Sequence, residues 1–255
     1  LSSMTKPPTL LLASLLAVQI SVLGRDNTAP AASTPAATPE ALITRFVQAS
    51  GGEAAIRKQT TRRTRAKLDI PAMGASGTID MLEAAPAKRF QELSFGESFT
   101  MTMGTDGQDA WVNIPGMGIQ DMSGPQAQNY IESARMMEIL SLPERFTKME
   151  VKPPTKVAGV ECDVVAGTNK RGSVELLHFA RPTGLLVRWD RQTANQAGEW
   201  VNGEMLMEDY REVDGIKLPF RLRMSNPSEG AVTLEITEVK HGVDAPAAKF
   251  TKPKQ

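Results

Sequence analysis

The sequence predicts a single antiparallel, mainly β domain. Short segments in which apolar and polar residues alternate recur along most of the chain, and Gly, Pro or Asp-Gly separates each from the next. Only two stretches show the apolar spacing of a substantial helix. At 255 residues, with 41% hydrophobic and 23% charged residues, the chain is long enough to bury the core of one large β domain.

The first helix is predicted to begin after residue 38. In "TPEALITRFVQASGG", Thr38 is a suitable N-cap, Pro39 suits the first helical position, and Gly51 ends the pattern. Between them, apolar residues recur at helical spacing, namely Leu42, Ile43, Phe46 and Val47. A second, shorter helical piece is expected at 53–57.

The rest of the domain is predicted to be strands, interrupted once. The interruption is a second substantial helix within "SGPQAQNYIESARMMEILSL", starting at Ser123 or Gly124 and stopping before Pro143. Three hairpin-like sequences, "GTDGQDAWVN", "KVAGVECDVV" and "EVDGIKLPFR", place Gly where tight turns demand a positive φ. About eleven or twelve strands are expected, at 65–70, 78–83, 89–94, 98–105, 110–114, 150–156, 161–168, 174–180, 185–192, 203–213, 216–225 and 232–241.

The N-terminal residues predict export. Lys6 precedes an uncharged apolar run, "TLLLASLLAVQISVLG", which suits a signal peptide and is short for a membrane-spanning helix. We therefore expect a signal peptide at 1–24, a disordered Ala/Pro/Thr linker at 25–38, and the folded domain at 39–255. A lipidated cysteine would follow Gly24, but Arg25 stands there. The expected location is thus periplasmic or secreted, without a stable membrane anchor.

The sequence carries little of the equipment that enzymes use. His178 and His241 stand outside any metal-binding or catalytic motif, and "GMGIQDMSG" fails the dinucleotide fingerprint because Asp121 replaces the third Gly. Carboxylates such as Asp80 and Glu83 could be proposed as acid and base, but solvated sheet-face carboxylates are the default. We predict no enzyme activity, no cofactor and no metal site. The 29 basic residues match 29 acidic ones, so no net charge attracts nucleic acid.

The basic cluster "TRRTRAK" at 61–67 has two interpretations. Charged side chains protect an edge strand from aggregation, so Arg62, Arg63, Arg65 and Lys67 would form a solvated edge. Alternatively, some of these arginines hold down a helical lid.

The sulfur-containing residues point to packing. Cys162 is the only cysteine, so no intramolecular disulfide can form, and its valine neighbours predict a buried apolar residue. Met101 with Met103, and Met205 with Met207, place two thioethers on one sheet face. Such pairs could bind Cu(I), fill a plain core, or form an adaptable wall facing lipid or ligand, and the sequence leaves all three open.

The strand at 216–225 shows the clearest alternation. Its apolar residues should face inward and its basic residues outward, because a one-residue slip would bury three cations. An inward face of this size, repeated over the strands, exceeds what two helices can cover. The sheet therefore closes into a barrel or curls over a cavity, and either leaves an apolar interior for a hydrophobic ligand. Its expected lining is Ile79, Met81, Phe99, Met101, Met103, Leu185, Val187, Trp189, Leu218, Phe220 and Leu222.

Several segments resemble a known superfamily. They are "GGEAAIRKQTTRRTRAKLDI", "GTIDMLEAAPAKRFQE", "GTDGQDAWVN", "MEDYREVDGIKLPFRLRM" and "LEITEVKHGVDAPAAKF", followed by Phe250 and Pro253. Together they are similar to the periplasmic outer-membrane lipoprotein-sorting superfamily (LolA/LolB-like), in its broad, mostly uncharacterised branch. The resemblance covers about residues 40–253.

The resemblance implies an unclosed antiparallel β-barrel of about eleven strands, with helices capping a hydrophobic cavity that holds lipoprotein acyl chains in the carriers. It implies no catalysis, and Arg62, Arg63 and Arg65 lie near the position of the carriers' lid-locking arginine. Two functions follow. One is a soluble exported binding protein for lipid, acyl chains or lipoprotein, with an envelope protein as a further partner. The other is a non-catalytic sensor or interaction domain with a packed interior, of the kind found fused to peptidases and cytochromes.

Overall fold

Thirteen strands form one antiparallel sheet in the part of the chain that the structure, a computed structural model, describes, residues 37–96 and 99–254. The expected signal peptide, and the linker up to residue 36, lie outside the described residues. The strands are β1 (Thr61–Ile70), β2 (Ala75–Ala84), β3 (Lys88–Phe95), β4 (Phe99–Thr105), β5 (Ala110–Ile114), β6 (Gly118–Asp121), β7 (Phe146–Val157), β8 (Val160–Asn169), β9 (Val174–Ala180), β10 (Leu186–Ala194), β11 (Trp200–Val213), β12 (Ile216–Asn226) and β13 (Gly230–His241).

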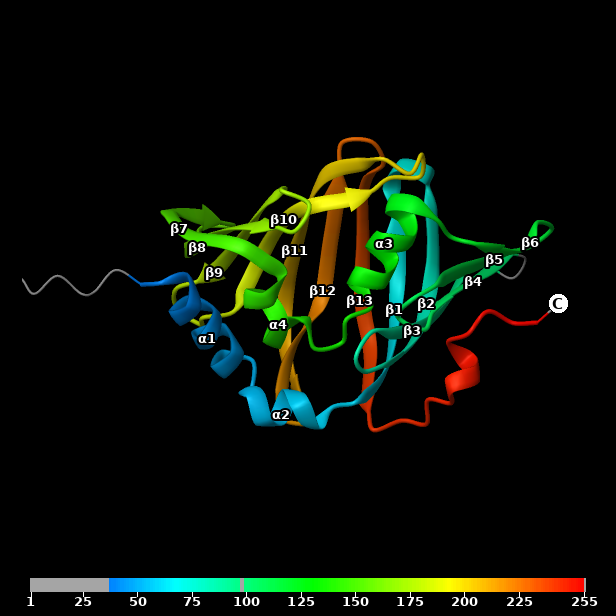
Figure 1. The fold of residues 1–255 in the computed structure, drawn as a ribbon, viewed down its shortest axis with the longest axis horizontal. Coiled ribbons are helices and arrows are strands. Elements are labelled where there is room, and N and C mark those ends of the chain that lie inside the picture. Colours follow the sequence, from blue (N-terminus) through cyan, green and yellow to red (C-terminus); the bar gives the residue numbers. More distant parts are fainter. Residues whose placement is uncertain (1–36, 97–98, 255) are drawn as a thin grey trace, which may run out of the picture. The chain divides into compact units, whose positions relative to one another are not determined.

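The strand order places the start of the domain in the middle of the sheet. The order is β6-β5-β4-β3-β2-β1-β13-β12-β11-β10-β9-β8-β7, so β1 pairs with both β2 and β13. The chain meanders from β1 to one edge, crosses to the opposite edge through α3 (Gly124–Ser133) and α4 (Glu138–Arg145), and meanders back (Figure 1). Within the described residues β6 and β7 each pair with a single neighbour. The sheet is therefore an unclosed barrel, as predicted.

The first two helices, α1 (Pro39–Ala49) and α2 (Glu53–Lys58), form where the sequence predicted them. Thr38 Oγ1 accepts a hydrogen bond from Ala41 N at 3.2 Å and caps α1. The helix ends against the β11–β12 turn, where Ser50 O accepts from Lys217 N at 2.9 Å. Gly51 has φ +116°, and a Cβ there would lie 2.2 Å from Gly215 O. Only glycine fits this close approach.

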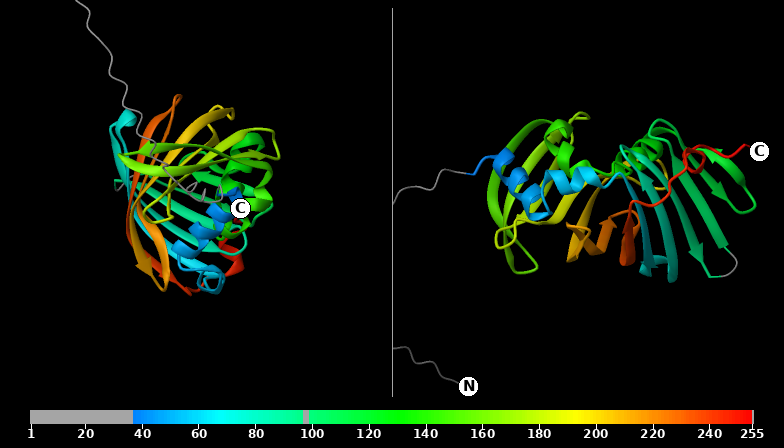
Figure 2. Two further views of the ribbon diagram at one scale, coloured as in Figure 1. Left: turned by 90° about the vertical axis from the view of Figure 1, so that its left-hand side faces the viewer. Right: turned by 90° about the horizontal axis from the view of Figure 1, so that it is seen from below.

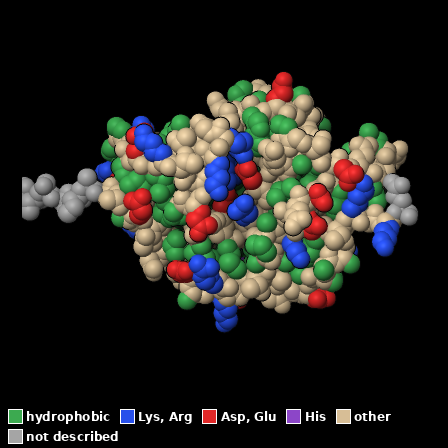
Figure 3. Space-filling model, viewed as in Figure 1, with side chains coloured by type: hydrophobic (Ala, Val, Ile, Leu, Met, Phe, Trp, Pro, Cys, Tyr) green, Lys and Arg blue, Asp and Glu red, His purple; other side chains and the backbone are tan. Residues whose placement is uncertain are grey.

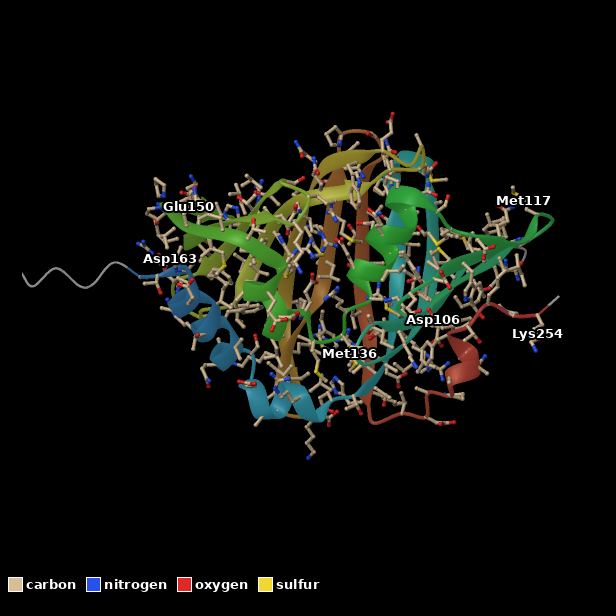
Figure 4. The ribbon with its side chains drawn as sticks, in the orientation of Figure 1. Asp106, Met117, Met136, Glu150, Asp163 and Lys254 are labelled. Carbon is tan, nitrogen blue, oxygen red and sulfur yellow. The ribbon has the colours of Figure 1, made fainter. Side chains whose placement is uncertain are left out.

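The second predicted helix is two helices. The chain leaves the helical path after Ser133 because the N–H of Met136 donates to Pro86 O at 3.1 Å, a tertiary hydrogen bond that competes with the helix. Figure 4 labels Met136 in this connection. The second helix, α4, then continues through Pro143, where a stop was expected. Strand β6 was also not predicted; it forms with β5 a hairpin whose exposed tip carries Met117 (Figure 4).

All three predicted hairpins have their glycine at positive φ, with Gly107 at 99° in the longer loop between β4 and β5. The other two are two-residue turns. Ala158 and Gly159 both have positive φ, at 48° and 83°, and so do Asp214 and Gly215, at 51° and 81°. This is the two-residue turn that matches the twist of antiparallel strands.

The four helices lie on one side of the curved sheet (Figure 2), and we call the face that they cover the inner face. Over β7 to β11 this face is packed shut. Leu42, Ile43 and Phe46 of α1 and Leu142 of α4 contact buried strand residues. Those strand residues are Phe146, Val165, Leu177, Phe179, Leu186, Trp189 and Met207, with Leu185 just before β10.

A small second core lies on the outer face, under the C-terminal segment. Trp111 and Phe250 are 2% and 1% exposed, and the Trp111 indole donates to Phe250 O at 3.2 Å. The Phe90 ring packs beside Trp111. The segment that the resemblance singled out at Phe250 therefore closes this end of the sheet.

Candidate ligand-binding face

Rows of paired residues cross the inner face and show which side chains share it. Residues directly opposite in an antiparallel pair lie on the same face. One row runs through Met101, Leu93, Ile79, Ala66 and Ile236, from β4 to β13. A parallel row runs through Leu68, Leu234, Leu222 and Met207, from β1 to β11.

Most of the predicted lining residues lie in these rows or at even spacing from them along the strands, and hence on the inner face. They are Ile79, Met81, Phe99, Met101, Met103, Trp189, Leu218, Phe220 and Leu222. Leu185 packs in the closed core with residues of α1. Val187 lies at a register shift in β10, and Val187 and Leu185 together line a hollow of about 640 Å³ with Leu206 and Arg223.

The alternation predicted for β12 is present. Ile216 and Phe220 are buried and Leu218, Leu222 and Met224 are half-buried, whereas the basic residues between them, Lys217, Arg221 and Arg223, are exposed. Phe220 is 8% exposed, and the Arg211 guanidinium lies 4.5 Å from its ring centroid. This ring is therefore covered by a side chain of the neighbouring strand.

The inner face differs between the two halves of the sheet. Around buried Ala66, Leu68, Ile79 and Leu234, a group of apolar side chains is only half-buried. The group comprises Ile70, Met81, Leu93, Phe95, Leu222, Met224, Val232 and Ile236, and we call these twelve residues the apolar face. Phe99, beside Phe95, is 38% exposed. Helix α1 packs against β7 and β8, and α4 packs against β7, so the apolar face lies on the half of the sheet that these two helices do not reach. Helix α3 contacts β5 on that half, and the apolar side chains there remain half-buried.

A polar row bounds the apolar face at the end where α2 leads into β1. It runs through His241, Arg62, Glu83, Arg89 and Thr105, one residue from each of five adjacent strands. Arg62 Nε and Nη2 donate to Glu83 Oε2 at 2.7 and 2.5 Å, and Arg89 Nη2 donates to Glu83 Oε1 at 2.8 Å. Burial raises the pKa of the Glu83 carboxyl, but Arg62 and Arg89 lower it by more. Glu83, 1% exposed, is therefore ionised between two arginines.

This row also ties α3 to the sheet. Arg89 Nη1 donates to Ser133 Oγ at 3.0 Å, and its guanidinium lies 6.0 Å from the Tyr130 ring centroid. Two buried polar atoms near the row, Tyr130 OH and His241 Nε2, have no hydrogen-bond partner among the described residues. The other nitrogen of His241, Nδ1, lies 2.9 Å from Asp214 Oδ2.

A second buried carboxylate, that of Glu175 on β9, links α4 to the sheet. Glu175 is 0% exposed and accepts hydrogen bonds from Arg145 Nη2 at 2.8 Å, Asn169 Nδ2 at 2.9 Å and Trp189 Nε1 at 2.9 Å. Arg145 also contacts Glu138 at 3.1 Å. Figure 3 shows charged side chains gathered over the middle of the helix-covered side, between hydrophobic areas. A network of charged groups, as well as apolar contacts, therefore holds α4 against the inner face over β7 to β11.

The edge-strand interpretation of the basic cluster is wrong, because β1 is central. Arg63 and Arg65 point to the outer face, where Arg63 Nη2 and Arg65 Nε lie 2.6 and 3.1 Å from Asp80 Oδ2. Arg65 Nη1 also lies 3.0 Å from Glu238 Oε2. Of the four basic residues in the cluster, Arg62 faces inward, and it connects to α3 through Glu83 and Arg89.

The remaining candidate residues do not assemble a catalytic site on the inner face. His178 is on the outer face, with Nδ1 3.1 Å from Thr155 Oγ1 and Nε2 3.1 Å from Asp190 Oδ2. Cys162 is fully buried, and burial raises the pKa of its thiol. In the described residues no group of three His, Cys, Asp or Glu side chains is arranged to hold a metal ion. Figure 4 labels Glu150 on the edge strand β7 and Asp163 on its neighbour β8, which lie at the same end of the sheet as α1.

Three solved structures share this architecture. A LolA superfamily protein from Nitrosomonas europaea matches with a TM-score of 0.56 and 14% identity, over 84% of this chain and 98% of its own. The chain has a LolA-like fold. A DUF1329 family protein from Desulfovibrio piger matches with a TM-score of 0.54 and 15% identity, over 83% and 96% of the two chains. A putative outer membrane lipoprotein-sorting protein domain from Vibrio parahaemolyticus matches with 0.54 and 11%, over 82% and 94%.

The sequence itself matches no family model and no curated protein significantly. At these identities the comparisons establish the LolA-like fold alone. Of the helices in the described residues, none combines the length and apolar character that a membrane-spanning helix needs.

Proposed function

We propose that this protein binds a hydrophobic ligand, a lipid or the acyl chains of a lipoprotein, on the apolar face, and that it does so without catalysis. The observation that carries the proposal is the contrast between the two halves of one sheet. Helices close the inner face over β7 to β11, whereas eight apolar residues of the apolar face remain half-buried. A contiguous group of partly accessible apolar side chains of this kind is typical of an interaction site.

Two observations support an exported location. The apolar run after Lys6 is typical of a signal peptide, and a solved structure with the same fold is described as a putative outer membrane lipoprotein-sorting protein domain. We therefore place the binding activity in the periplasm or outside the cell, with an envelope protein as the source or recipient of the ligand.

The experiment is uptake of a fluorescent acyl probe by the purified mature chain, with native mass spectrometry of protein taken from an expressing envelope. Met101 lies directly opposite Leu93 of the apolar face, and its neighbour on β4, Thr102, points to the outer face. Met101→Gln should weaken probe binding about tenfold, since an amide is placed where the probe's chain would lie. Thr102→Gln is the matched control and should leave binding unchanged.

The alternative function is a sensor or interaction domain with a packed interior. The closely packed inner face over β7 to β11 supports this alternative for that half of the sheet. The alternative predicts a bare protein mass and no probe uptake. Equal effects of the two β4 substitutions would also contradict a site on the inner face.

A further inference from the structure

The polar row carries a surplus of positive charge at one end of the apolar face. Two arginines, Arg62 and Arg89, share the single carboxylate of Glu83, which leaves one positive charge among the three groups. Their side chains are 21%, 13% and 1% exposed in the same order. A charge removed from water to this degree is stabilised by a counter-charge and by hydrogen bonds. Asp214, in the β11–β12 turn, is a further carboxylate that contacts a member of this row, but it is 58% exposed and its contact is to His241 Nδ1, at 2.9 Å.

Two further groups on this side have unmet hydrogen-bonding capacity. Tyr130 is 8% exposed and its hydroxyl has no partner in the described residues, although it lies on α3 beside Arg89. His241 has a side chain 3% exposed, and its Nε2 likewise has no partner there. Buried polar atoms are nearly always satisfied, so these two point to an acceptor or donor supplied by a ligand.

The apolar face and the polar row together have the dimensions of one amphiphile. From Arg62 to Leu68 the inner face of β1 turns from charged to apolar through Thr64 and Ala66. Six residues of strand span about 20 Å, and one leaflet's share of a bilayer's hydrocarbon core is about 15 Å. An acyl chain of that length, lying along β1 from the polar row, would therefore cover Thr64 and Ala66 and extend toward Leu68.

We propose that the ligand is an amphiphile with a single anionic head, and that the head binds at the polar row, against Arg62, Arg89 and the Tyr130 hydroxyl, while the chain covers the apolar face. This rests on the proposed function and specifies its ligand class. Arg62 uses Nε and Nη2 on Glu83, which leaves Nη1 for another acceptor, and a carboxylate or phosphate oxygen is the acceptor that an arginine favours.

The test compares ligands that differ only in charge. Palmitic acid and the fatty alcohol of the same chain compete against a fluorescent acyl probe, and dissociation constants are measured for both. A second pair, palmitoyl lysophosphatidic acid and monopalmitoylglycerol, distinguishes a phosphate head from a carboxylate. The variants are Arg62→Gln and, as a matched control, Arg63→Gln, its sequence neighbour on the outer face, which also loses an ion pair.

The wild-type protein should bind the acid about tenfold or more tighter than the alcohol, the effect expected of a charge-assisted hydrogen bond. Arg62→Gln should abolish that preference and leave alcohol binding within about twofold, whereas Arg63→Gln should keep it. Equal wild-type affinity for acid and alcohol overturns the anionic head but not the proposed function. Binding of neither ligand refutes the proposed function itself. Equal loss of both ligands in Arg62→Gln assigns Arg62 a structural role and overturns the proposal.

If circular dichroism shows that Arg62→Gln does not fold, a second variant still tests the proposal. Tyr130→Phe removes only a hydroxyl that has no partner in the described residues, so the free protein should be as stable as the wild type or more so. Its preference for palmitic acid should nevertheless fall severalfold. An unchanged preference in Tyr130→Phe would then overturn the proposal.

Discussion

Substituting Glu175 by alanine should destabilise the protein strongly, because this carboxylate organises the join between α4 and the sheet. Glu175 is fully buried and accepts hydrogen bonds from Arg145, Asn169 and Trp189. The change leaves a positive charge and two neutral donors without their acceptor. Removing one member of a buried ion pair costs about 3 to 5 kcal/mol.

The structure indicates the lower part of that range. Arg145 is 12% exposed and keeps a contact to Glu138 at 3.1 Å, so its charge is not left wholly unpaired. We therefore expect Glu175→Ala to lower the free energy of unfolding by about 3 kcal/mol. Glu175→Gln keeps one acceptor oxygen for Trp189 or Asn169 and should cost less than the alanine variant.

Urea denaturation followed by circular dichroism at neutral pH measures the effect. The control is Glu161→Ala on β8, whose carboxylate is 49% exposed and pairs with Lys156 at 3.2 Å. An exposed pair of this kind contributes about 0 to 1 kcal/mol. A loss below about 1 kcal/mol for Glu175→Ala, or equal losses for the two variants, would refute the idea that this network holds α4 in place.

Three other predictions follow from the same structure. Phe220→Ala should cost about 3 to 5 kcal/mol because the ring is 8% exposed, while Arg221→Ala, its exposed neighbour, should change stability little; urea melts that do not separate the pair would contradict the burial argument. The pKa of Glu83 lies below its ordinary value of 4.5, so its ion pairs stabilise the fold above that pH and are lost as pH falls. Glu83→Gln should therefore flatten the fall in stability between about pH 5 and pH 3, measured by thermal melts; an unchanged acid slope would assign that slope to other groups. Gly51→Ala should lower the melting temperature, since a Cβ would lie 2.2 Å from Gly215 O and φ is +116°; wild-type melting would show that the turn can move aside.

Local patterns were enough to predict most of the strands and the first helices. The alternation in β12 fixes which face is buried, because a slip by one residue would reverse every side chain. Thr38 and Pro39 define the start of α1, and Ala158-Gly159 and Asp214-Gly215 form the expected turns. Each of these signals is contained within a few neighbouring residues.

The errors arose where a distant segment decides the outcome. The break between α3 and α4 depends on the hydrogen bond from Met136 N to Pro86 O, fifty residues away in sequence (136 against 86). The placement of β1 in the middle of the sheet depends on its pairing with β13, which charge alone cannot reveal. The Arg62–Glu83–Arg89 row could not be predicted for the same reason. The sequence did contain evidence against pairing Asp80 with Glu83 as acid and base. The two residues are three positions apart in a strand, so their side chains point to opposite faces of the sheet.

The apolar face illustrates how coverage, rather than strand pattern, separates a core from a binding site. Met205 and Met207 alternate on β11 as Met101 and Met103 do on β4, and the sequence gives no reason to distinguish them. Met207 is buried and Met205 packs against the same closed core with α1 and α4, whereas Met101 and Met103 remain half-buried on the other half of the sheet. Helices α1 and α4 pack over one half, because α4 directly precedes the edge strand β7, whereas α3 reaches the other half through contacts with β5 and with Arg89 of β3. The topology therefore gives one half of a uniformly patterned sheet a closely packed cover and leaves the apolar side chains of the other half only half-buried, which is the condition that the proposed binding requires.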